Sequence, residues 1–86
     1  MADCYVAIIN ISQDVPHFVS FQGAGSEQYK DAKEVARQRG YEVVAEIFGV
    51  SSEMVDKIKE PLAGLIEMLN AGEKLHPQVE LEKLIE

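Results

Sequence analysis

The sequence is poor in the residues that most protein chemistry requires. Its 86 residues include one cysteine, two histidines and no tryptophan. Because Cys4 has no second cysteine, no disulfide can form within the chain, and a reducing compartment is the default expectation. His17 and His76 lie far apart, and neither has a second ligand at the local spacing typical of metal sites. We therefore expect no metal site and no cofactor.

Basic residues are also scarce. Eight Lys and Arg face fifteen Asp and Glu, which gives a net charge of −7. Binding to nucleic-acid phosphates requires clustered cations, so we expect no direct nucleic-acid binding. Glu residues are concentrated in the last third of the chain, from Glu60 to Glu86. This indicates either a solvated acidic surface, which we favour, or an acidic patch that docks on a basic protein or imitates DNA.

Long apolar runs are missing as well. No run approaches the roughly 18–20 residues of a membrane span, and no signal peptide is recognisable, so we expect a cytoplasmic protein without a membrane partner. The hydrophobic fraction of 47% is typical of a globular protein. The length suits one small domain covering residues 1–86, and a chain this short would gain stability from self-association.

What the sequence does contain is a clear helix–turn–strand pattern from Ser26 to Phe48. Apolar residues at spacings of three and four predict a helix over 26–39 that begins at an N-cap serine. Gly40 can adopt the left-handed conformation that ends a helix. The β-branched residues that follow predict a strand over 41–48 with one apolar face. Upstream, the run CYVAIINI at 4–11 predicts a strand buried on both faces, as at the centre of a parallel sheet.

Three further segments complete the prediction. The residues HFVSF at 17–21 are either a short strand that forms a hairpin with the first strand or an ordered loop. The apolar spacing from Val55 to Leu69 predicts a helix, but Pro61 interrupts it. We therefore place the main helix at 61–71, after a looser turn at 52–59 that Ser51 or Ser52 caps. Residues 78–86 are predicted as a helix, with a strand as the alternative, and Pro77 can begin it.

These elements predict an α/β fold with a small, mainly parallel sheet and flanking helices. A right-handed crossover would then join strand 4–11 to strand 41–48. The alternative is an α+β fold with an N-terminal β-hairpin, which applies if residues 17–21 form a strand.

The order of segments resembles one known family. An apolar strand with Ser12 at its end is followed by a loop and then by EQYKDAKEVARQRGYEVVAEIFGVSS and EPLAGLIEMLNAG. This order is similar to the N-terminal catalytic domain of serine recombinases, the resolvase and invertase family. The resemblance places Ser12 at the nucleophile, Gln28 at a helix glutamine, Gly40 and Tyr41 at a turn, Val50 and Ser51 at a second turn, and Pro61 at an arginine–proline pair.

The sequence departs from that family where the chemistry is carried out. Asn10 and Glu60 stand where the resemblance would require arginines, and the tail ELEKLIE has none of the later ones. Those arginines would neutralise the phosphodiester and its transition state, and a Glu reverses the charge. We also expect no DNA-binding helix-turn-helix domain. The resemblance therefore implies a catalytically silent relative, and a hairpin at 17–21 would count against it.

The sequence thus favours a non-enzymatic protein-binding module that self-associates. The predicted interface is the apolar helix face formed by Leu62, Leu65, Ile66 and Leu69. One alternative is an acidic inhibitor or DNA mimic of mobile-element or phage origin. Another is a recombinase-type DNA strand transferase that uses Ser12.

Overall fold

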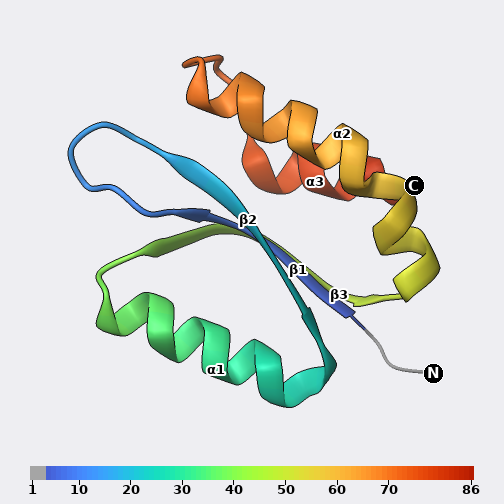
Figure 1. Ribbon diagram of the computed structural model, residues 1–86. Coiled ribbons are helices and arrows are strands. Elements are labelled where there is room, and N and C mark those ends of the chain that lie inside the picture. The colour runs from blue at the N-terminus through green and yellow to red at the C-terminus, as the bar shows by residue number, and fades with distance from the viewer. Residues whose placement is uncertain (1–3) are drawn as a thin grey trace.

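The computed structural model describes residues 4–86, except for the side chains of residues 24–29 and 32. Its elements, in chain order, are β1 (Cys4–Asn10), β2 (Phe18–Ala24), α1 (Gly25–Gln38), β3 (Glu42–Val50), α2 (Ser52–Asn70) and α3 (Pro77–Leu84). Figure 1 shows the sheet as a middle layer, with α1 on one face and with α2 and α3 on the other. The chain therefore forms three layers.

The sheet is antiparallel, so the prediction of a mainly parallel sheet is wrong. The strand order is β2-β1-β3, and both outer strands run antiparallel to β1. The fold is the α+β alternative with an N-terminal hairpin, and no crossover joins β1 to β3. Helix α1 instead connects β2 to β3, which are separated by β1. The run CYVAIINI is apolar because helices cover both faces of β1, and this pattern does not specify the direction of its neighbours.

Asn10 shapes the hairpin between β1 and β2. Its side-chain Oδ1 accepts hydrogen bonds from the backbone N–H of Ser12 at 3.2 Å and of His17 at 3.1 Å. The Ile11 N–H also donates to the His17 carbonyl at 2.9 Å. These bonds join the two ends of the loop and align Asn10 with Phe18 in the β-ladder. Segment 17–21 consequently enters the sheet instead of forming an isolated loop.

Two apolar cores lie on opposite faces of the sheet. The larger core packs Val6 and Ile8 of β1 against the buried stripe of α2 and against Leu81 of α3. The smaller core contains Tyr5, Ala7 and Ile9 and faces α1. Successive side chains of a strand point to opposite faces, so β1 supplies both cores in alternation. Among the described residues, the core on the α2–α3 side therefore contains more buried apolar side chains than the core on the α1 side.

Helix α2 is continuous through Pro61, which corrects the predicted break at 59–61. Its buried residues Val55, Ile58, Leu62, Leu65 and Leu69 form one stripe along its length. Pro61 itself is exposed. A proline inside a helix costs about 3 kcal/mol, whereas burying each large aliphatic side chain contributes about 1.5–3 kcal/mol. The stripe on both sides of Pro61 therefore outweighs the loss of one helical hydrogen bond.

Several local predictions are confirmed. Gly40 has a φ of 75° at the end of α1, and the Ser51 side chain caps α2 by accepting from the Met54 N–H at 3.2 Å. The segment from Pro77 is helical, with Pro77 in its first turn. The Ser26 side chain, the predicted cap of α1, lies outside the described residues. Among the described residues, no helix is both long and apolar enough to cross a membrane.

Two glycines provide a test of the backbone geometry. Gly40→Ala places a Cβ in the left-handed region and 3.1 Å from Gln13 Nε2, so we expect the free energy of unfolding to fall by about 1 kcal/mol. Gly64→Ala, within α2, meets no atom within 4 Å and should stabilise the protein by roughly 0.5–1 kcal/mol. Urea denaturation of both variants measures these changes. Equal effects of the same sign would contradict the assigned geometry.

Candidate functional site

An apolar groove lies between α1 and the β2 side of the sheet. It has a volume of about 510 Å³. The floor consists of β1 and β2 residues, and the wall consists of α1 residues and Tyr41. The described lining residues are Ile9, Ile11, Val19, Ser20, Phe21, Gln22, Asp31, Val35, Ala36 and Tyr41. Among them only Asp31 carries a charge, and Val35 is 47% exposed, so the groove presents apolar surface to solvent.

The backbone of β2 is partly unpaired next to this groove. Residues of an outer antiparallel strand alternately direct their N–H and C=O groups toward the neighbouring strand and away from it. Phe18 directs both groups away, because they bond to the Asn70 side chain: the Phe18 N–H donates to Oδ1 at 2.6 Å, and Nδ2 donates to the Phe18 carbonyl at 3.0 Å. Ser20 and Gln22 have the same alternation. No described side chain or loop caps their outward groups.

We call the backbone from Ser20 to Gln22 the open edge. At one end it is bounded by the Asn70 cap on Phe18. At the other end β2 finishes at Ala24, and α1 begins at Gly25. Exposed, unpaired strand edges are templates for pairing with another chain, and proteins usually block them. Here the open edge lies directly beside an apolar groove.

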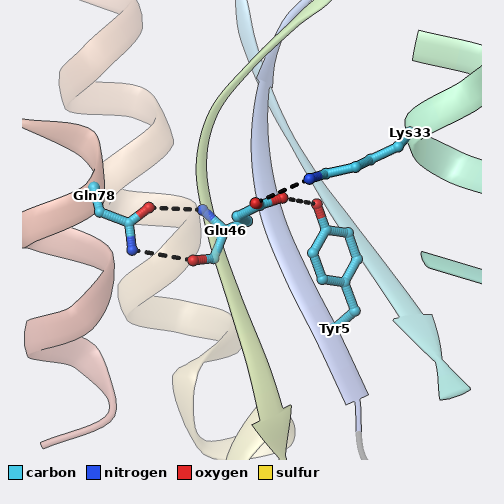
Figure 2. Close-up of polar contacts among 4 residues, drawn as sticks. All are labelled: Tyr5, Lys33, Glu46 and Gln78. Atoms are coloured by element: carbon cyan, nitrogen blue, oxygen red, sulfur yellow. Dashed lines mark hydrogen bonds and ion pairs between the residues drawn. The ribbon is translucent and has the colours of Figure 1, made fainter. Parts of the chain in front are cut away.

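The opposite edge of the sheet, at β3, is blocked by α3. Figure 2 shows the Gln78 side chain of α3 against the backbone of Glu46. The Glu46 N–H donates to Gln78 Oε1 at 2.9 Å, and Gln78 Nε2 donates to the Glu46 carbonyl at 3.0 Å. A side-chain amide thus takes the place of a neighbouring strand. Helix α3 also contacts β3, so a partner strand could pair with Glu46 only by displacing Gln78.

The Glu46 side chain positions α1 from the other face of β3. Figure 2 shows its carboxylate between Tyr5 and Lys33. The Tyr5 hydroxyl donates to Oε2 at 2.8 Å, and Lys33 Nζ lies 3.1 Å from Oε1. The Lys33 and Glu46 side chains are 40% and 29% exposed, so solvent screens the ion pair. Its role is geometric, because it joins α1 to β3 at the side away from the groove.

Two further charged residues of α1, Glu34 and Arg37, form an ion pair with each other. On its exposed surface Arg37 donates to Glu34 at 2.7 Å. This hydrogen bond, together with the positive charge of Arg37, lowers the pKa of the Glu34 carboxyl below its ordinary value. Lys33, as described above, pairs with Glu46.

The predicted interface residues lie mostly inside the protein. Leu62, Leu65 and Leu69 are 1%, 3% and 6% exposed and form part of the larger core. Ile66 is partly buried against the same core. The apolar helix face that suggested a partner is covered by the sheet of this chain. Sequence reasoning missed the groove because its floor and its α1 wall come together only through the fold.

The described positions that match the recombinase family lie in several elements of the fold, and the loop that holds Ser12 contacts the turn at Gly40 through Gln13, whose Nε2 donates to the Gly40 carbonyl at 3.3 Å. Ser12 is half-buried in the loop after β1, where its N–H bonds to Asn10. The Gln28 side chain lies outside the described residues. Glu60 is exposed on α2. Recombinase-type chemistry at Ser12 stays a hypothesis, and the observed hairpin is the arrangement that counts against the resemblance.

No metal centre is evident within the described part of the chain. There, no group of three or more His, Cys, Asp or Glu side chains could hold an ion. His76 has another role, because its Nδ1 accepts from the Val79 N–H at 3.4 Å and caps α3. Cys4 is half-buried against the larger core.

Comparisons with protein-family models, curated proteins and solved structures found no significant match.

The amide of Gln78 can be tested by Gln78→Ala. This change removes two hydrogen bonds to the Glu46 backbone, and at about 0.5–1.5 kcal/mol each the free energy of unfolding should fall by roughly 1–3 kcal/mol. Hydrogen exchange at the Glu46 amide should become faster. Gln38→Ala is the control, since the Gln38 amide makes one exposed bond to Glu34 and should change stability by less than about 0.5 kcal/mol. Equal effects of the two substitutions would contradict edge blocking by Gln78.

Proposed function

We propose that this chain is a non-enzymatic protein-binding module that adds an extended protein segment to β2 as a fourth strand of the sheet. The observation that carries this proposal is the open edge at Ser20–Gln22 beside the apolar groove. In strand addition, main-chain hydrogen bonds contribute affinity, and pockets for alternate side chains contribute specificity. This site offers both components side by side.

The groove supports strand addition more than catalysis. Its described hydroxyl groups belong to Ser20 and Tyr41, and no described histidine or carboxylate is hydrogen-bonded to either one. A nucleophilic hydroxyl needs such a base within about 2.6–3.2 Å. The lining is otherwise mostly aliphatic and aromatic, which suits the alternate side chains of an extended segment. The predicted protein-binding function is therefore retained, but with its site moved from α2 to β2.

Phe21 and Phe48 form a matched pair for testing this function. Both rings contact Tyr5, with centroids at 6.1 Å and 5.0 Å, but Phe21 lines the groove and Phe48 lies on β3. We expect Phe21→Ser to weaken binding of extended peptides, selected by display on the wild-type protein, by about tenfold or more, which corresponds to roughly 1.4 kcal/mol. Phe48→Ser should leave binding nearly unchanged.

Circular dichroism must first show that both serine variants are folded at the assay temperature. Peptides that bind both variants equally well would place the docking surface elsewhere. If no peptide can be selected whose binding depends on Phe21, strand addition to β2 is contradicted. The exception is a protein whose β2 edge is already occupied by another copy of the chain, and sedimentation detects such a dimer.

The acidic inhibitor or DNA mimic is the second candidate function. One observation favours it: Glu67, Glu80 and Glu82 belong to α2 and α3, which cover the same face of the sheet. Glu73 and Glu86 lie in the segments adjoining these helices. Replacing all five with Gln should abolish salt-sensitive binding to a basic DNA-binding domain, if the carboxylates mediate it. Titration in low and high salt measures this, and unchanged binding would exclude the acidic surface.

A further inference from the structure

We propose that the segment added at the open edge is β2 of a second copy of this chain, running antiparallel about a two-fold axis at Phe21. This inference rests on the proposed strand-addition function and identifies its partner. The result would be a continuous six-stranded sheet in the order β3-β1-β2-β2-β1-β3. Because the axis is perpendicular to the sheet, both α1 helices would lie on the same face.

The open edge complements itself in only one way. Ser20 and Gln22 lie one residue before and one residue after Phe21. With Phe21 opposite the partner's Phe21, Ser20 lies opposite the partner's Gln22, and Gln22 lies opposite the partner's Ser20. Each of these two pairs can exchange two backbone hydrogen bonds. All outward groups of the open edge are then satisfied in both copies.

Neighbouring registers are less favourable for reasons visible in the structure. A register centred on Ser20 would pair Gln22 with the partner's Phe18, whose outward groups already bond to Asn70. A register centred on Gln22 would instead pair Ser20 with the partner's Ala24, the last residue of β2 before α1 begins. The length of the open edge therefore selects the register centred on Phe21.

The charge distribution favours this edge for contact between two acidic copies. The chain has a net charge of −7, yet β2 (FVSFQGA) contains no charged residue. By contrast, β3 carries Glu42 and Glu46. Like charges directly opposite each other destabilise a strand pair. Two copies can consequently pair through β2 without placing carboxylates opposite one another in the ladder.

The groove supplies apolar surface that a short strand pair lacks. A standard interface takes about 800 Å² from each partner, and the chain exposes 5740 Å² in total. Three paired residues cannot supply that area alone. In the two-fold dimer, Phe21, Val19 and the exposed Val35 of both copies would line one continuous apolar groove. The dimer would therefore cover the groove and the open edge together.

Cysteine pairs test both the partner and the register. In a Cys4→Ala background, Ser20→Cys and Gln22→Cys chains are prepared separately, with a cleavable mass tag on one of them. The proposed register places the two new cysteines directly opposite each other when the chains are mixed. In a dimer of two Ser20→Cys chains, or of two Gln22→Cys chains, the two cysteines lie at diagonal positions, roughly 7–8 Å apart. This distance is beyond the usual Cα separation of a disulfide.

We expect a disulfide-linked dimer when the two variants are mixed and oxidised, and almost no disulfide-linked dimer when either variant is oxidised alone. Sedimentation of the untagged wild-type protein should give roughly twice the chain mass, and Phe21→Ser should return it to the monomer mass while Phe48→Ser does not. Equal cross-linking of one cysteine variant alone would overturn the register. A monomeric wild-type protein that gives no cross-links would contradict the proposal that the partner is a second copy of this chain. If peptides still bind in a way that depends on Phe21, the proposed strand addition to β2 would be supported even so.

Discussion

The structure depends on β1 being apolar on both of its faces. Residues Tyr5 to Ile9 are all buried, with side chains alternating between the two sides of the sheet. A strand of this kind must be the central one and must be covered by a layer on each side. Hence β2 and β3 flank it, α1 covers one face, and α2 with α3 covers the other.

The two covering layers are unequal, and this inequality accounts for the position of the groove. On the α2–α3 side, buried residues from α2, α3, β1 and β3 interlock, and Leu81 is 0% exposed. On the α1 side the buried cluster of described residues consists of Tyr5, Ala7 and Ile9, with partly buried residues around it. Lys33 and Glu46 hold α1 toward β3. The apolar surface near β2 is consequently left as a groove.

Much of the local structure could be predicted from the sequence, because the signals lie within a few residues of their effects. The turn at Gly40, the cap at Ser51 and the helix that begins at Pro77 all follow from neighbouring residues. The direction of the strands could not be predicted, since a strand buried on both faces has the same apolar pattern in parallel and antiparallel sheets. Pro61 misled the helix prediction because burial across the whole of α2 outweighs its local cost.

The site itself was beyond sequence reasoning, because it depends on contacts between distant segments. Asn70 meets Phe18 across 52 residues, and Gln78 meets Glu46 across 32 residues. Nothing in the sequence near either amide indicates these partners.

Both amides do the same thing, each satisfying the outward N–H and C=O of one strand residue, yet their consequences differ. Gln78 belongs to α3, which contacts β3, and it occupies that edge at Glu46. Asn70 lies at the end of α2 and reaches only the first residue of β2. The β3 edge is therefore blocked at Glu46, in the middle of the strand, whereas the β2 edge is blocked at Phe18, where the strand begins. The proposed association at β2 rests on this difference between the edges.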